Sequence, residues 1–308
     1  MNSLRQTLVD YLAVRRALGY KLARPERLLR QFLTYLEGLG EERVTTKVAL
    51  AWATLPKDAD RYWWSSRLSI VRGFAAHLRA RDSTTEVPPA DLLPARPCRM
   101  TPYFYSEEEI ASLARAAARI RSAHRAATYR TLISLLAITG MRVGEAIGLD
   151  LSDFDARSGL LTIRNAKFGK SRELPLHASA VDALRRHLKR RNQLRSAASS
   201  PALFVSTTGT RLCYNNVQCT FHRLVRHVGL EPRSGSCRPR LHDLRHSFAV
   251  RTLLEGYRQG GDTGARLALL STYLGHVNPA GTYWYLSAAP ELMDLAGARL
   301  ERYLGGES

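Results

Sequence analysis

The sequence predicts a mainly α-helical protein with one small antiparallel β-sheet, an α+β fold built as two domains. Three observations support this prediction. Apolar residues recur at helical spacing along most of the chain, one stretch near residue 165 has the pattern of a β-hairpin, and a proline-rich stretch interrupts the helical pattern. We therefore expect a helical domain at 1–82, a linker at 83–102 and a second domain at 103–308.

The first domain is predicted from three amphipathic segments. The segment LRQTLVDYLAVRRALGY is expected to bury one face made of Leu4, Leu8, Leu12 and Val14. The segment RPERLLRQFLTYLEGLG has Pro25 near its first turn and glycines at its end, which are typical helix boundaries. In RYWWSSRLSIVRGFAAHLRA, helical spacing is shown by Leu68, Val71, Ala75 and Leu78. The expected result is a small all-helical domain.

The linker and the second domain follow from a change in composition. The stretch DSTTEVPPADLLPARPCRMTP holds five prolines, so it cannot stay helical and is expected to be extended. Ser106 and Glu109 then form a capping-box pattern that opens a new helix. Two β-type runs flank NAKFGKS, which predicts a hairpin. Helical patterns return near 177–195, 214–228, 241–255 and 288–304.

Composition limits the class of protein. The formal net charge is +19 and the isoelectric point is about 10.4, with an excess of Lys and Arg in both halves of the chain. Such a charge favours a polyanionic partner, with a solubility adaptation or arginine-rich codon usage as the alternative. We find no apolar run long enough to span a bilayer and no signal-peptide pattern, so we expect a cytoplasmic protein without a membrane partner.

The cysteines are expected to be free thiols. No two of them form a CxxC pair, and the spacing of Cys213 and Cys219 to His222 and His227 does not suit a zinc finger. We expect no metal site.

The segment LHDLRHSFAV carries the first candidate functional residues. His242, Arg245 and His246 share one face of a predicted helix. Arginine binds phosphate bidentately, and histidine exchanges a proton near neutral pH. The alternatives are a solvated helix face or a core histidine.

Two further segments add cations. In TGMRVGEAIGL, Arg142 follows a glycine turn, and Glu145 could hold its guanidinium, although a surface ion pair would look the same. In AKFGKSR, Lys167 and Lys170 lie on the predicted hairpin tip, where a lysine can protonate a leaving oxygen or simply be solvated.

A fourth segment, LGHVNPAGTYWYLSA, contains His276 and, nine residues later, Tyr285. Tyr283 and other aromatic residues lie nearby, so packing of a C-terminal helix is an alternative. Together, two arginines, two histidines and a lysine are the groups that a metal-free phosphoryl transfer needs, and a tyrosine hydroxyl could attack the phosphorus. We expect no cofactor, since the chain lacks a nucleotide-binding loop.

These motifs, in this order, resemble those of the tyrosine recombinases, the phage integrase family, over residues 103–308. TGMRVGEAIGL resembles the family's first arginine box, LHDLRHSF its His-x-x-Arg box, and LGH with Tyr285 its histidine and nucleophile. The resemblance implies that Tyr285 forms a 3′-phosphotyrosine and that the phosphate oxygens are bound by Arg142, Arg245 and His276. It also implies that Lys167 protonates the leaving 5′ oxygen and that His242 assists proton transfer.

The resemblance further implies a fold and partners. Residues 1–82 resemble the helical core-binding (SAM-like) domain, and 103–308 the catalytic domain. The expected partners are double-stranded DNA and a homotetramer on two duplexes, with accessory DNA-bending proteins also compatible. The expected location is the nucleoid of a bacterial cytoplasm. The C-terminal segment PELMDLAGARLERYL is expected to dock on a neighbouring protomer or to pack on its own domain.

Other cations are candidates for DNA contacts. They are Arg15, Arg16, Lys21 and Arg24 in the first domain and Arg164, Arg172, Arg238 and Arg240 in the second. Each would bind phosphate without reading sequence, and each could equally be a solvated surface residue.

The sequence therefore predicts a site-specific DNA recombinase that integrates, excises or transposes a mobile element. The alternatives are a type IB-like topoisomerase, a hairpin-forming resolvase and a catalytically idle DNA-binding relative. A metal hydrolase built on His242 and Asp243 would need more converging ligands than the sequence offers.

Overall fold

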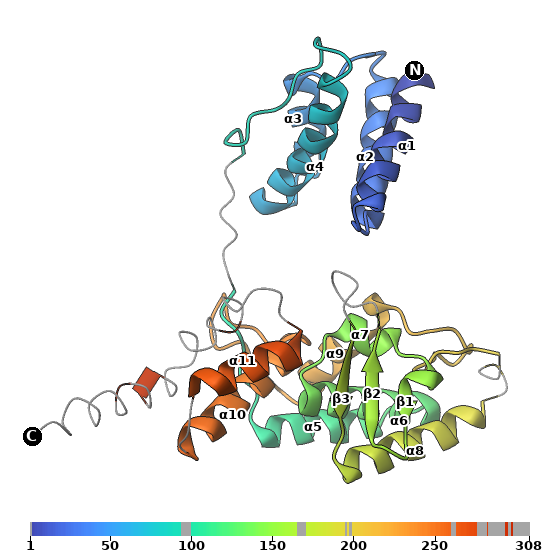
Figure 1. Cartoon of the computed structure of the whole chain (residues 1–308), viewed down its shortest axis with the longest axis vertical. Helices are drawn as coiled ribbons and strands as arrows, with labels where there is room; N and C mark the ends of the chain where they lie inside the picture. Colours follow the sequence, from blue (N-terminus) through green and yellow to red (C-terminus); the bar gives the residue numbers. More distant parts are fainter. Residues whose placement is uncertain are drawn as a thin grey trace, which may run out of the picture. The chain divides into compact units, whose positions relative to one another are not determined.

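The structure is a computed structural model of the chain. It describes residues 2–93, 100–164, 171–194, 196, 199–259, 263–275, 282, 293, 294 and 297. The chain divides into two compact units, Met1–Arg99 and Met100–Ser308 (Figure 1). Each unit has its own hydrophobic core.

The first unit is a bundle of helices. Its helices are α1 (Asn2–Ala17), α2 (Ala23–Gly38), α3 (Thr46–Thr54) and α4 (Arg61–Arg79). Phe32 of α2 packs edge-on against Trp52 of α3, with ring centroids 5.3 Å apart, at the centre of the core. The predicted apolar face of α4 is buried as expected. In α1, Leu8 and Leu12 are buried, but Val14 is 54% exposed, because a residue two positions after Leu12 lies on another side of the helix.

Helix α3 was not anticipated from the sequence. Thr45 caps it by accepting a hydrogen bond from the Val48 amide at 3.3 Å. Arg67 of α4 closes over it, with its guanidinium 3.8 Å from the Trp52 ring centroid and a 2.7 Å hydrogen bond to the Trp52 carbonyl.

Residues 83–93, the first part of the predicted linker, form no helix or strand but belong to the first unit and pack against its helices. The Glu86 amide donates to the Val44 carbonyl at 3.0 Å. Arg72 donates to the carbonyls of Pro88 and Pro89 at 2.7 Å each. Prolines lack an amide hydrogen, but their carbonyls accept, and this fastens the stretch to α4.

The second unit is mainly helical with one small sheet, which confirms the predicted fold class. Its elements are α5 (Glu107–Ala118), α6 (Ala123–Thr139), α7 (Val143–Gly148), the 3-10 helix η1 (Leu151–Asp153), β1 (Phe154–Asp155), β2 (Leu160–Ile163), β3 (Arg172–Pro175), α8 (Ala178–Asn192), α9 (Tyr214–His227), α10 (Asp243–Arg258) and α11 (Thr263–Leu274). The strands form an antiparallel sheet in the order β1-β2-β3, with Leu161 opposite Leu174 and both side chains buried.

Local sequence explains several boundaries in this unit. The Ser106–Glu109 capping box opens α5 as predicted. The hairpin of β2 and β3 is also present, while its tip at 165–170 lies outside the described residues, as does nearly all of the helix predicted at 288–304. None of the described helices is long and apolar enough to cross a membrane.

Candidate functional site

Arg142 is delivered by a glycine turn at the end of α6. Gly140 ends that helix with φ +58°, a left-handed conformation that favours glycine. A Cβ at this position would overlap the Phe248 ring of α10. Arg142 follows as the N-cap residue of α7, so the turn sets the direction in which its side chain points.

Glu145 holds Arg142 in place. One carboxylate oxygen accepts from the Arg142 backbone amide and the other from its guanidinium, both at 2.9 Å. A second guanidinium nitrogen lies 3.4 Å from the Gly275 carbonyl after α11. The Arg142 side chain is still 32% exposed, so its position is fixed while part of its surface stays accessible.

The same carboxylate also binds Arg172 of β3. Two nitrogens of Arg172 donate to Glu145, at 2.8 and 3.2 Å, and a third donates to the Tyr273 carbonyl at 2.8 Å. Although burial alone would raise it, the hydrogen bonds from Arg172 and Arg142 lower the pKa of Glu145 below its usual value. Glu145 is thus an ionised bridge between two arginines. Arg172, predicted as a DNA contact, is only 14% exposed, and its guanidinium nitrogens donate to Glu145 and to the Tyr273 carbonyl.

Arg245 lies in the first turn of α10 and is only 2% exposed. Its two terminal nitrogens donate to the carbonyls of Gly140 and Leu274, both at 2.8 Å. These bonds join α10 to the end of α6 and to the end of α11. The alternative of a solvated helix face does not describe this residue.

His242 is the N-cap residue of α10 and is exposed at the surface. Desolvation by the surrounding protein, followed by the positive charges of Arg245 and Arg142, lowers the pKa of His242 to about 4. The positive end of the helix dipole acts in the same direction. His242 is therefore neutral at pH 7. The ring of His246 stands perpendicular to it, with centroids 4.9 Å apart.

Asp243, the residue after His242, holds Arg240 at the start of α10. It is fully buried and accepts from the Arg240 guanidinium at 2.9 and 3.0 Å. Arg240 is consequently held in an ion pair, which restricts its predicted role as a DNA contact.

Arg142, Arg245 and His242 are therefore brought together by the meeting of α6, α7, α10 and α11. Two fixed cations and a neutral imidazole can bind a phosphate group and relay a proton beside it. No group of three or more His, Cys, Asp or Glu suited to a metal ion occurs within the described part of the chain.

Three predicted site residues, Lys167, His276 and Tyr285, lie outside the described residues. Described residues lie close to two of them in the sequence. Gly275, directly before His276, accepts the bond from Arg142. Arg172, which follows Lys167 in the sequence and begins β3, binds Glu145.

The remaining DNA-contact candidates differ in how they are held. Arg164 is 60% exposed and pairs with Asp153 at 2.6 Å, and Arg238 is exposed. In the first unit, Arg16 pairs with Glu26, and Lys21 is exposed. The other two lie over aromatic rings, Arg15 over Tyr20 at 4.2 Å and Arg24 over Trp63 at 4.4 Å.

Sequence reasoning anticipated the glycine turn before Arg142 but missed the bonds that hold Arg172 against Glu145 and the close approach at Gly275. Gly275 has φ +68°, and a Cβ there would lie 2.8 Å from an Arg172 nitrogen. The glycine in LGH was the available signal, because a glycine at a helix end favours a left-handed cap.

Comparison with known proteins identifies the family. Residues 104–291 match the phage integrase family. The protein named integrase/recombinase y4rB of Sinorhizobium fredii is 46% identical over 308 residues, 98% of each chain. Tyrosine recombinase XerC of Mycobacterium leprae is 32% identical over 268 residues, 85% of this chain and 86% of that protein.

The fold is also found in solved structures. The crystal structure of a lambda integrase tetramer bound to a Holliday junction superposes with a TM-score of 0.58 at 19% identity, over 92% of this chain and 76% of that one. The protein is an enzyme that cleaves and rejoins DNA, and it belongs to the phage integrase family of tyrosine recombinases.

Proposed function

We propose that this protein is a site-specific recombinase that cuts and rejoins DNA through a 3′-phosphotyrosine and serves the integration, excision or transposition of a mobile element. The observation that carries the proposal is the convergence of Arg142, Arg245 and His242 around one surface. This arrangement suits a backbone phosphate, and the family is one that acts on DNA.

The arginines bind the non-bridging oxygens of the scissile phosphate. Arg245 is buried and held by carbonyls, so little reorganisation is needed when the negative charge of the pentavalent transition state develops. Arg142 is oriented by Glu145 and offers its exposed edge. His242 is neutral in the free protein, so it can accept a proton or a hydrogen bond. Its pKa should rise in the transition state, because the negative charge on the phosphate then balances the positive charges of the two arginines.

Tyr285 is the nucleophile in this scheme. Its oxygen attacks phosphorus and the 5′ oxygen leaves, so that the phosphodiester becomes a phosphotyrosine ester and a free 5′ hydroxyl. Lys167 donates the proton to the leaving oxygen, and His276 binds the phosphate with the arginines. Attack by a 5′ hydroxyl from a partner strand reverses the step and restores Tyr285. The supports are the family and the positions of these residues in the sequence.

The working assembly is a homotetramer on two duplexes. The support comes from the shared fold, since the matched lambda integrase structure is a tetramer on a Holliday junction. The first unit binds DNA as a core-binding domain, for which the exposed Lys21 and Arg24 are candidate phosphate contacts.

The test is covalent trapping on duplexes that carry a nick near the scissile position, tiled across the DNA that flanks the gene. Wild-type protein should form an adduct that survives denaturing gel electrophoresis. Tyr285→Phe should form none while it retains duplex binding. Tyr283→Phe is the matched control and should trap normally. Adduct formation by the Tyr285→Phe variant, or its loss only in Tyr283→Phe, contradicts the assignment.

A further inference from the structure

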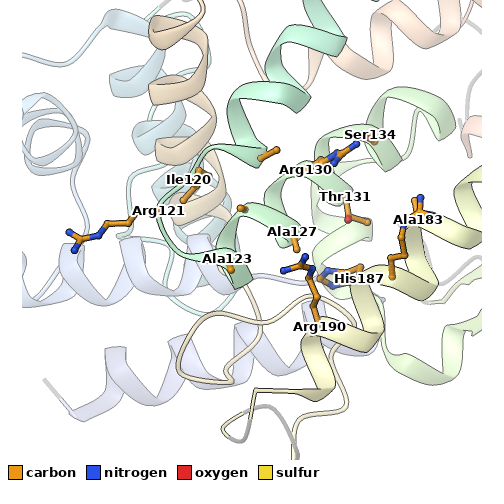
Figure 2. Close-up of a pocket in the computed structure, with 13 residues that line it drawn as sticks. Ile120, Arg121, Ala123, Ala127, Arg130, Thr131, Ser134, Ala183, His187 and Arg190 are labelled. Carbon is orange, nitrogen blue, oxygen red and sulfur yellow. The ribbon is translucent and has the colours of Figure 1, made fainter.

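A cavity of about 520 Å³ lies between α6, α8 and the turn that joins α5 to α6 (Figure 2). Its walls are formed mainly by small side chains, among them Ala123, Ala126, Ala127 and Ala183. Thr131 and Ser134 of α6 add two hydroxyl groups. The volume lies in the range of small-molecule sites in proteins.

The cavity is lined by four arginines: Arg121, Arg130, Arg186 and Arg190. No Asp or Glu belongs to its lining. Among the residues that the structure describes, none of these guanidinium groups makes an ion pair or a side-chain hydrogen bond, in contrast to the neighbouring Arg191, which donates to the carbonyls of Ala202 and Ser200. The lining of the cavity therefore carries positive charge and no carboxylate, and the nearest acidic residue on α8, Asp182, pairs with Arg185 outside it.

His187 adds a polar group to the lining. It is 2% exposed, and its Nε2 donates to the Leu203 carbonyl at 3.2 Å. Its Nδ1 must then be a hydrogen-bond acceptor, and it has no partner among the described residues. Figure 2 shows the guanidinium of Arg190 next to the His187 ring and facing Ala127, whereas Arg121 points away from the group. A ligand that paired with these arginines and with Nδ1 of His187 would carry negative charge and at least one N–H or O–H donor.

We propose that this cavity binds a nucleoside polyphosphate, with the phosphates on Arg130, Arg186 and Arg190 and a sugar hydroxyl or amino group near His187. Guanidinium groups bind phosphate oxygens in pairs of charge-assisted hydrogen bonds. The second source of the same phosphate chemistry is the DNA backbone. Location argues against it, because α8 and α7, which begins next to Arg142, lie at opposite edges of the second unit (Figure 1). A duplex held at Arg142 would face away from α8.

The test is calorimetric titration of the full-length protein with ATP, with GTP and with inorganic tripolyphosphate. ATP or GTP should bind, and tripolyphosphate should bind more weakly, because it lacks the sugar and base. In Arg130→Gln/Arg190→Gln, the affinity should fall at least about tenfold, since each lost charge-assisted bond costs more than about 1.4 kcal/mol. The matched control is Arg157→Gln/Arg226→Gln, which removes two exposed arginines outside the cavity and should bind as wild type.

A second variant, Ala127→Glu, places a carboxylate on the cavity wall and should weaken binding without removing an arginine. Thermal melting establishes that each variant is folded. Absence of nucleotide binding at millimolar concentration, or equal binding by the cavity and control variants, overturns the proposal. The proposal is also overturned if the wild type binds no nucleotide and a cavity variant loses affinity for a random duplex. The cavity would then be a DNA contact.

Discussion

Glu145 provides the sharpest test of how the candidate site is held together. Its carboxylate is only 9% exposed and accepts from two arginines, at 2.9 Å from Arg142 and 2.8 Å from Arg172. Glu145→Gln keeps the size of the side chain but removes the charge. Two guanidinium groups are then left close together without an anion between them. Removing one partner of a buried ion pair costs about 3–5 kcal/mol.

We expect a loss near the lower end of that range, about 3 kcal/mol in the free energy of unfolding, because Arg142 is partly solvated and can relax into water. Strand cleavage should fall much further than DNA affinity, since Arg142 would lose its orientation but not its charge. Urea unfolding measures the first quantity, and adduct trapping beside duplex binding measures the second.

The matched control is Glu107→Gln. Glu107 pairs with Arg251 at 3.4 Å, but its side chain is 76% exposed, so the change in the free energy of unfolding should stay within about 0.5 kcal/mol.

The pH dependence of stability is a second test of the role of Glu145. The pKa of Glu145 is lowered in the fold by its arginines, so its contribution is complete above the unfolded value and is lost as the pH falls through the folded value. The difference between wild type and Glu145→Gln should therefore shrink below about pH 4. A Glu145→Gln variant as stable and as active as wild type would refute the bridging role.

Two further predictions concern the interior of the second unit. Burial lowers the pKa of His187 to about 4, so the unfolded chain binds a proton at higher pH than the fold does. Stability should fall as the pH drops from about 6.5 to 4, by up to roughly 3 kcal/mol from this residue, and urea unfolding of His187→Phe should lack that component. Gly140→Ala should lose about 2–4 kcal/mol, from left-handed strain and overlap with Phe248, as measured by thermal melting, while an unchanged melting temperature would show that the turn can relax.

The helices that the sequence predicted are those with a clear apolar and polar face. Helix α4 buries its spaced apolar residues as expected. Helix α3 was missed because TKVALAWAT is apolar almost throughout and offers no contrast between faces. The packing of residues 83–93 on the helices of the first unit was also missed, since proline content predicts an extended backbone but not the arginine that donates hydrogen bonds to its carbonyls.

For the candidate site, contacts within one helical turn were predictable and long-range ones were not. Glu145 follows Arg142 by three residues, and their pairing could be expected from that spacing alone. The bond from Arg172 to the same carboxylate joins a strand to a helix across 27 residues, and no local pattern encodes it. Arg172 therefore looked like any other surface cation in the sequence.

The net charge of +19 includes two kinds of arginine, which differ in burial. This difference decides how each kind can bind phosphate. The bonds from Arg245 to the carbonyls of Gly140 and Leu274 fix its guanidinium in a buried position. A buried cation held by dipoles has lost hydration, and it gains more from an incoming anion than a solvated one does. Arg130 and Arg190, by contrast, are exposed, so their guanidinium groups remain hydrated until a ligand binds. The first arrangement suits a transition state that carries extra negative charge for a moment, and the second suits reversible binding of a stable anion.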